Sequence, residues 1–137
     1  MTYFLDTNIC IYYLKGLYPD LPDRLHSHQV SKIKIASIVK AELLYGALNS
    51  KKKVDNIDKV ENFLLPFEII NFDDKAARIY AEVRLALKKM GAPIGPNDLI
   101  IAATVIAKEG ILVTNNEQEF SRVPRLCLEN WTKSRNP

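Results

Sequence analysis

Apolar residues gather in short runs along this chain, and the runs alternate with longer segments in which apolar positions recur every three or four residues. The short runs predict β-strands at residues 3–5, 32–36, 67–72, 111–114 and 126–128. The periodic segments predict helices at residues 9–15, 37–49, 54–65, 73–89 and 99–108, of which the second is capped by Ser37. Gly16 and Gly91 are typical helix-ending residues. The stretch RLHSHQ, residues 24–29, is predicted to be a polar surface loop that carries both histidines, His26 and His28.

Alternating strands and helices predict an α/β fold in which a mostly parallel central sheet has helices on both faces. The length of 137 residues suits one domain, for which we expect the bounds 1–132, followed by a flexible tail at 133–137. In such sheets the functional site lies outside the carboxyl ends of the strands. Polar residues that directly follow the predicted strands are therefore the first candidates for chemistry.

Composition narrows the possible functions only a little. The chain is 47% hydrophobic and 26% charged, and its net charge of +3 permits nucleic-acid binding without requiring it. Basic residues cluster at two places, which are either solvated surface or RNA contacts: Lys51 to Lys53, and Arg84 with Lys88 and Lys89. Cys10 and Cys127 lie in apolar sequence and are predicted to be buried thiols, with a disulfide between them left open. No stretch is long enough to span a bilayer, so we expect a soluble intracellular protein.

Two aspartates stand at positions where a site would be built. Asp6 ends the first predicted strand in LDTN, where a lone aspartate is commonly a turn residue or a helix cap. Asp98 follows Asn97, a candidate cap, at the start of a helix that is apolar almost all round, where a carboxylate suits the helix dipole. Its helix face also carries Ala102 and Val105, so we expect Asp98 to point toward the interior end of the sheet.

Glu42 raises a similar question. It shares a predicted helix face with Ile38 and Tyr45, and this face is expected to pack inward. Burying an unpaired charge is costly. Glu42 is therefore either an edge residue that reaches past the core to water or a carboxylate directed into a site.

The segment TNNEQEF, residues 114–120, follows a strand that should run parallel to residues 3–5. Its polar side chains then emerge at the sheet edge that carries Asp6: Asn115, Asn116, Glu117 and Glu119. Carboxylates held close together repel one another unless a cation neutralises them. Oxygen ligands without cysteine or histidine select Mg²⁺ or Mn²⁺. The pattern therefore predicts metal-dependent hydrolysis of a phosphodiester.

These segments resemble the PIN-domain ribonucleases, and most closely the VapC toxins of bacterial toxin–antitoxin pairs: LDTN, KAELLYGA, PNDLIIAATVIAKEGILVTNN and the following EF, with the likeness extending through LENW. The resemblance implies an α/β/α sandwich and a cytoplasmic endoribonuclease that depends on Mg²⁺ or Mn²⁺. Members with the TNN and EF variant include enzymes that cut initiator tRNA in the anticodon loop, which implies tRNA as substrate and inhibition of translation. The implied partners are a VapB-type antitoxin and a second copy of the chain. The apolar helices at 9–14 and 38–48 either form the antitoxin groove or are simply core faces.

The resemblance also maps residue by residue. Asp6, Glu42 and Asp98 match the first three acidic positions of the family, with Asp6 and Asp98 expected to hold the metal. Glu42 is expected to orient the attacking water or to hold a second metal. Many members have an aspartate where this chain has Asn116, so Glu119 is expected to supply the fourth carboxylate. The residues expected to brace and shape the site are Thr7, Asn8, Asn115 and Asn116.

Two alternative functions, each of a different kind from a ribonuclease, are also considered. A phosphatase of the aspartyl-phosphate kind would use Asp6 as nucleophile, but it needs a second aspartate where this chain has Asn8. A non-catalytic PIN scaffold or RNA-binding module is the other alternative. The presence of Asp6, Glu42 and Asp98 argues against such a scaffold.

Overall fold

The computed structural model of the protein describes residues 1–134 and has a five-stranded sheet at its centre. The strands are β1 (Tyr3–Leu5), β2 (Ile33–Ala36), β3 (Glu68–Ile70), β4 (Ile111–Val113) and β5 (Cys127–Glu129). They lie in the order β3-β2-β1-β4-β5, and every neighbouring pair is parallel. The predicted parallel sheet is confirmed, and each predicted strand is present within a few residues of its expected bounds.

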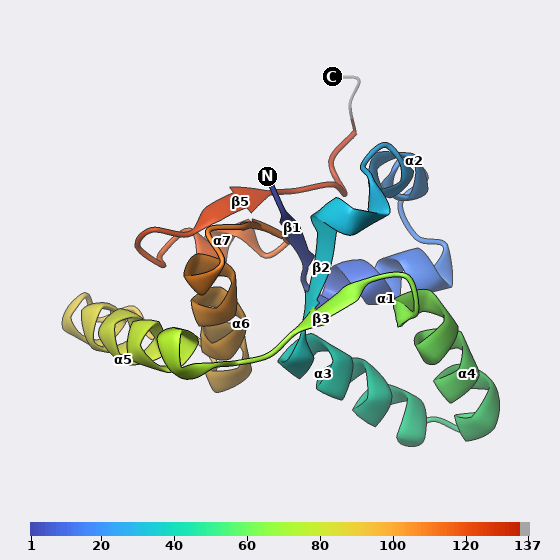
Figure 1. Cartoon of the computed structure of the whole chain (residues 1–137), viewed down its shortest axis with the longest axis horizontal. Helices are drawn as coiled ribbons and strands as arrows, with labels where there is room; N and C mark the ends of the chain where they lie inside the picture. The colour runs from blue at the N-terminus through green and yellow to red at the C-terminus, as the bar shows by residue number, and fades with distance from the viewer. Residues whose placement is uncertain (135–137) are drawn as a thin grey trace.

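Seven α-helices and one 3₁₀ turn surround the sheet within residues 1–134: α1 (Thr7–Lys15), α2 (Leu21–His26), η1 (Val30–Lys32), α3 (Ser37–Leu48), α4 (Lys53–Leu64), α5 (Asp74–Lys89), α6 (Pro96–Ala107) and α7 (Glu117–Phe120). Figure 1 shows α1 and α4 on one side of the sheet and α5 and α6 on the other. The arrangement is therefore an α/β/α sandwich, as expected. None of the helices in the described part of the chain combines the length and the apolar character needed to cross a membrane.

The register of the central strands decides which residues meet at the edge of the sheet. Leu5 on β1 lies opposite Val113 on β4. The backbone N–H of Asp6 then donates to the carbonyl oxygen of Val113 at 2.9 Å, so the chain leaves both strands at the same level. Asp6 and Thr114, which directly follow these strands, are thereby brought together at the carboxyl edge of the sheet.

The chain turns from strands into helices through caps that the sequence supplies. Asp6 has an extended backbone and caps α1, with its side chain accepting from the backbone N–H of Thr7. Asp73 caps α5 in the same way through the N–H of Ala76. Gly16 and Gly91 follow the ends of α1 and α5 with φ angles of 69° and 68°, which only glycine adopts without strain. The helix ends predicted at these two glycines are confirmed.

The core fills both faces of the three central strands. Its largest fully buried side chains include Trp131, Phe4, Phe120, Leu5 and Leu112. Gly110, just before β4, is required by this packing, because a Cβ there would lie 2.7 Å from the ring of Phe4. Helix α6 is buried along most of its length, as its uniformly apolar sequence predicts.

Two predictions about the surface were wrong. The first half of RLHSHQ, residues 24–26, belongs to α2 and not to a loop, because Leu21 and Leu25, one helical turn apart, both insert into the core, whereas residues 27–29 lie outside the helix as expected. Cys127 is exposed, because it lies on β5 at the edge of the sheet, whereas Cys10 is buried as expected. Both cysteines are free, so no disulfide joins them.

Three local predictions about helices also need correction. Tyr45 is 68% exposed, so the face of α3 that carries Glu42 does not pack inward along its whole length. Ser37 is the first residue of α3 and not its cap, because Ala36 occupies that position. Gly95, not Asn97, takes the cap position of α6, with Pro96 in the first turn.

In the predicted tail, residues 135–137 lie outside the described residues, while the ammonium of Lys133 lies 2.9 Å from a carboxylate oxygen of Glu117.

Candidate active site

Asp6 is the buried centre of a group of polar side chains at the carboxyl edge of the sheet. It is 5% exposed, and each of its carboxylate oxygens accepts one hydrogen bond, Oδ1 from the N–H of Thr7 and Oδ2 from the hydroxyl of Thr114, both at 2.8 Å. Burial raises the pKa of the Asp6 carboxyl above its ordinary value of 3.8, and the two hydrogen bonds oppose that rise. The negative charges of Glu42 and Glu119 raise the pKa further. Asp6 is therefore held in place and is short of positive charge.

Glu42 approaches Asp6 from α3, on the second turn of that helix. Its Oε1 accepts from the Thr7 hydroxyl at 2.7 Å, and its Oε2 accepts from the side-chain amide of Asn97 at 3.4 Å. These bonds link α3 to the first residue of α1 and to the first turn of α6. Glu42 is thus directed into the site and not outward past the core.

Asp98 lies in the first turn of α6 and is half-buried. Burial is the main reason that the pKa of its carboxyl rises from 3.8 to about 7. The charges of Asp6, Glu119 and Glu42 raise the pKa further, in that order, and so does a hydrogen bond with Glu119. The perturbation shows that four carboxylates from distant parts of the chain are close enough to influence one another.

Glu119 reaches the same edge from α7. Its Oε2 accepts from the side-chain amide of Asn116 at 3.0 Å, and its Oε1 accepts from the backbone N–H of Gly95 at 3.3 Å. The Asn116 hydrogen bond is the largest cause that lowers the pKa of Glu119, against the effect of burial. Asn116 therefore serves here as a donor that keeps Glu119 ionised, a role that an aspartate could not fill.

The remaining predicted site residues differ in how they take part. Asn115 donates from its side-chain amide to the hydroxyl of Tyr12 at 3.0 Å and so braces the loop after β4 against α1. The side chain of Asn8 is exposed and makes no hydrogen bond with any other residue in the range 1–134, so the structure does not place it as a brace for Asp6. Thr7 is the residue that bridges Asp6 and Glu42.

Two supporting residues were not predicted from the sequence. Thr114 is fully buried; its hydroxyl donates to Asp6 and accepts from the backbone N–H of Asn116. Gly95 places its N–H against Glu119. The signal for Thr114 was present, because a hydroxyl at the end of an otherwise apolar strand needs a partner when it is buried. A backbone donor such as Gly95 leaves no such signal in the side-chain pattern.

The donor chemistry of this edge suits a hard divalent cation. Its ionisable side chains Asp6, Glu42, Asp98 and Glu119 are all carboxylates, and none of them belongs to an ion pair formed within residues 1–134. The charge of Arg122 acts on one of them only, as a minor cause that lowers the pKa of Glu119. No three histidine, cysteine or acidic side chains of the described chain converge into a ready-made ligand group. Mg²⁺ needs no such group, because it commonly takes one or two protein carboxylates and completes its shell with waters and phosphate oxygens. The residues present therefore fit this type of metal.

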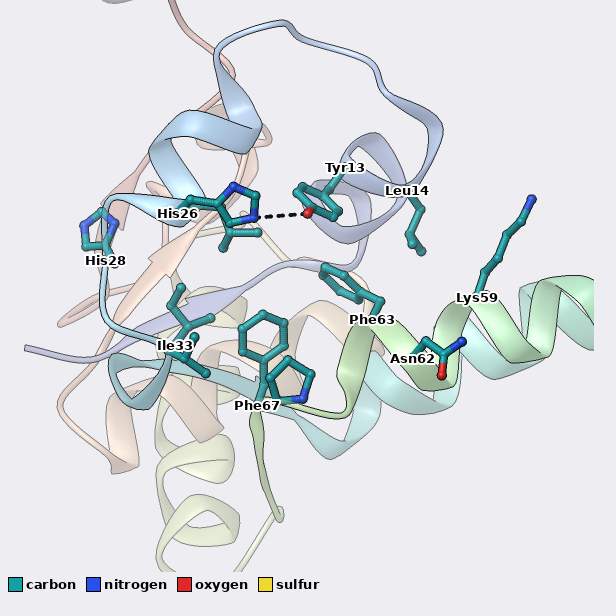
Figure 2. A pocket seen from close by; sticks show the side chains of 12 residues that line it. Tyr13, Leu14, His26, His28, Ile33, Lys59, Asn62, Phe63 and Phe67 are labelled. Carbon is teal, nitrogen blue, oxygen red and sulfur yellow. Dashed lines mark hydrogen bonds between the residues drawn. The ribbon is translucent and has the colours of Figure 1, made fainter.

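Two hollows open on the α1 and α4 side of the sheet, and one of them reaches the carboxylates. The first, about 450 Å³, includes Glu42 in its wall and runs between α1, α3 and α4. The second, about 570 Å³, is shown in Figure 2, where Tyr13, Phe63 and Phe67 face it and the Tyr13 hydroxyl lies 3.2 Å from the imidazole of His26. Leu14 and Lys59 line both hollows, so the two adjoin and are treated together. We call the pair the α1–α4 trough.

Comparison with known proteins gives consistent results. The family model of the PIN domain matches residues 3–126. Ribonuclease VapC2 of Rickettsia felis is 46% identical over 138 residues, which cover 97% of this chain and 100% of that protein. A protein of Shigella flexneri named tRNA(fMet)-specific endonuclease VapC is 35% identical over 132 residues, covering 96% of this chain and 99% of that protein.

Solved structures agree with the sequence relatives. VapBC2 from Rickettsia felis, bound to a DNA fragment from its promoter, contains a chain that superposes with a TM-score of 0.89 at 45% identity, covering 96% of this chain and 99% of that chain. DNA-bound VapBC from Salmonella typhimurium gives a TM-score of 0.91 at 34% identity, covering 96% and 98%. The similarity therefore extends over whole chains on both sides.

Proposed function

Because the chain belongs to the PIN-domain family and, within it, to the VapC ribonucleases of toxin–antitoxin systems, we propose that it is a Mg²⁺- or Mn²⁺-dependent endoribonuclease that cuts tRNA in the cytoplasm and thereby inhibits translation. One observation carries the metal dependence. Four carboxylates meet at one edge of the sheet, where burial first and then repulsion by the other three raise the pKa of Asp98 to about 7. Such a cluster is stable in its ionised form only with a cation beside it. The choice of tRNA is supported by the name of the Shigella flexneri relative.

The residues divide the work according to their surroundings. Asp6 and Asp98 would hold the cation, which when bound makes a water more acidic and neutralises charge on the phosphate. Glu42, whose Oε1 accepts from the Thr7 hydroxyl, would accept the proton of the attacking water. The water oxygen bonds to phosphorus, the bond from phosphorus to the 3′-oxygen breaks, and the leaving oxygen takes up a proton. The products are a 5′-phosphate and a 3′-hydroxyl.

Cleavage of total tRNA by the purified protein tests this proposal. We expect discrete fragments with Mg²⁺ or Mn²⁺, and none with EDTA or with Asp6→Asn, whose melting temperature should remain that of a folded protein. Fragment ends can be identified by their 5′-phosphate. Cleavage at the normal rate by Asp6→Asn would refute the assignment of the metal site. Binding of tRNA without any cleavage would favour the non-catalytic scaffold instead.

We further propose that a VapB-type antitoxin occupies the α1–α4 trough. VapB is the partner in the similar structures, and the trough combines an apolar lining with the exposed ammonium groups of Lys15 and Lys59 and with Glu42 at one end. An antitoxin segment with an apolar face and a basic side chain would cover the trough and neutralise Glu42.

Leu14→Ala tests the trough, because Leu14 lines both of its hollows. We expect antitoxin affinity to fall roughly tenfold by calorimetry. Leu17→Ala is the matched control, since Leu17 is exposed just beyond α1 and lines neither hollow. Equal losses from both substitutions would place the antitoxin elsewhere.

A homodimer is the second proposed assembly. Its support is the outer face of α3, where Tyr45 and Leu48 are 68% and 54% exposed. Adjacent exposed apolar side chains of this size are typical of a surface that a protein partner covers. Sedimentation equilibrium of the protein without antitoxin measures the assembly directly, and a monomer at micromolar concentration would refute it.

A further inference from the structure

A third hollow lies on the opposite side of the sheet from the α1–α4 trough. It has a volume of about 530 Å³ and opens between α5 and the segment that leads into α6. In Figure 1, α5 and α6 lie against each other on this side. Its wall combines an aromatic ring, two cations and an apolar segment: Tyr80, Arg84, Lys88, Pro93, Ile94 and Pro96. We call it the α5–α6 pocket.

Among the described residues, the two cations of the α5–α6 pocket have no acidic partner. Arg84 and Lys88 are exposed and take part in none of the ion pairs formed within residues 1–134. Arg84 instead donates to the Tyr80 hydroxyl at 3.2 Å, and its guanidinium carbon lies 6.0 Å from the centre of the Tyr80 ring. Arg78, on the same helix, differs because it pairs with Asp74 at 3.0 Å.

The α5–α6 pocket is joined to the carboxylates by a very short piece of chain. Ile94 and Pro96 line the pocket, and Gly95 between them donates its N–H to Glu119. Asp98 stands two residues farther on, in the same first turn of α6 as Pro96. Residues 94–98 therefore contribute both to the pocket wall and to the acidic edge. An RNA strand bound at the carboxylates would pass beside the pocket.

The chemistry of the pocket favours single-stranded nucleic acid. A base presents an apolar face that packs against aromatic rings and proline, and the phosphates on either side of it need cations. Tyr80 also has the exposed ring of Phe72 at 6.0 Å in an edge-on arrangement, which extends the aromatic surface beyond the pocket.

We propose that the α5–α6 pocket is a nucleotide subsite for the RNA substrate, next to the phosphate that is cut. The base packs against Tyr80 and the 93–96 segment, and Arg84 and Lys88 contact the flanking phosphates. The subsite rests on the proposed ribonuclease function. It adds residues that select and position the RNA without touching the reacting atoms.

Binding of RNA in EDTA tests the subsite without cleavage. The probes are a labelled single-stranded oligo(U) and total tRNA, titrated by fluorescence anisotropy at several salt concentrations. Tyr80→Ala should weaken binding about tenfold and Tyr80→Phe less than about twofold, because the phenylalanine keeps the ring. Arg84→Ala should weaken binding about fivefold, and the slope of log K against log salt should become shallower by about 0.7, the value for one lost phosphate contact on a single strand. In the cleavage assay, Arg84→Ala should raise KM and leave kcat unchanged.

Arg78→Ala is the matched control, since it removes the same charge from the same helix outside the pocket. Equal affinities and slopes for Arg84→Ala and Arg78→Ala would overturn the subsite, because they would indicate only a general positive field. A change in oligomeric state of Arg84→Ala by sedimentation would also overturn it and would assign the pocket to a contact between two copies. If the wild type cuts no RNA but the binding differences persist, the nuclease proposal fails, and the pocket remains an RNA-binding site without a cleaved phosphate beside it. Loss of cleavage in the Arg84→Ala protein through kcat alone would contradict a binding role.

Discussion

Replacing Asp98 by asparagine should stabilise the metal-free protein at neutral pH while it abolishes cleavage. The pKa of Asp98 is about 7 in the folded protein against 3.8 for the free carboxyl. A folded-state pKa that is raised contributes stability below the unfolded pKa, and this contribution is lost as the pH rises through the folded pKa. The wild type therefore loses stability between about pH 4 and pH 7, where the unfolded chain has released the proton and the folded chain still holds it. An asparagine cannot titrate and is spared this loss.

The size of the effect follows from the shift. About three pKa units at 1.36 kcal/mol each give about 4 kcal/mol for a fully buried group. Because Asp98 is only half-buried, solvent screening reduces this to about 2 kcal/mol. In a domain of this length, that corresponds to a rise of about 6 °C in the melting temperature at pH 8. At pH 4 the two proteins should melt within about 1 °C of each other, apart from any loss of the hydrogen bond to Glu119.

Thermal melts in EDTA from pH 4 to pH 8.5 measure this directly. Asp55→Asn is the matched control, because Asp55 occupies the same third position in the first turn of α4 and is exposed. It loses the same helix-dipole interaction without leaving a carboxylate cluster. A pH-independent difference between wild type and Asp98→Asn, or a difference equal to that of Asp55→Asn, would refute the repulsion argument. Added Mg²⁺ should stabilise the wild type more than Asp98→Asn.

Two further predictions concern the bracing of the site and the packing of the sheet. Thr7→Val removes the hydroxyl that holds Glu42 and should lower kcat about tenfold, whereas Thr7→Ser keeps the donor and should change kcat by less than about twofold. Steady-state cleavage of tRNA measures kcat for both variants. Equal rates for the two would contradict the bracing role. Gly110→Ala forces a methyl group against Phe4 and should cost about 1–3 kcal/mol in urea unfolding, whereas Gly46→Ala, inside α3 with open space around it, should stabilise by about 0.5–1 kcal/mol. If both glycines respond alike, the close approach at Phe4 does not decide the stability of this corner.

The sequence predicted the acidic edge because one simple rule governs it. Side chains that directly follow parallel strands meet at the same edge, and this places Asp6 and the 115–119 segment together without any knowledge of contacts. The positions of Asp98 and Glu42 in the site were harder to predict, because each of these residues lies on a helix. A carboxylate on an apolar helix is costly and therefore notable, but it left more than one interpretation open at both positions, and the resemblance to the PIN-domain ribonucleases assigned them to the site.

The missed features depend on information that one-dimensional patterns do not carry. Helix α3 is apolar on several sides, so periodicity could not show that Tyr45 faces outward while Leu43 faces the core. The helix α2 is a single short element, and its two core leucines look like any pair of apolar residues in a loop. The contact of Gly95 with Glu119 joins a backbone group to a side chain 24 residues away, and no residue type announces it.

The bond from Thr114 to Asp6 spans 108 positions of the sequence, which has a consequence for when the protein becomes active. Strand β1 lies in the middle of the sheet, so the strand made first during synthesis must wait for β4, which is made among the last. A nascent chain that has reached only α5 carries Asp6 and Glu42 but neither Asp98 nor Thr114. Such a chain lacks two residues of the proposed active site. If these carboxylates cut RNA as proposed, the chain gains this activity only after the ribosome has nearly finished it.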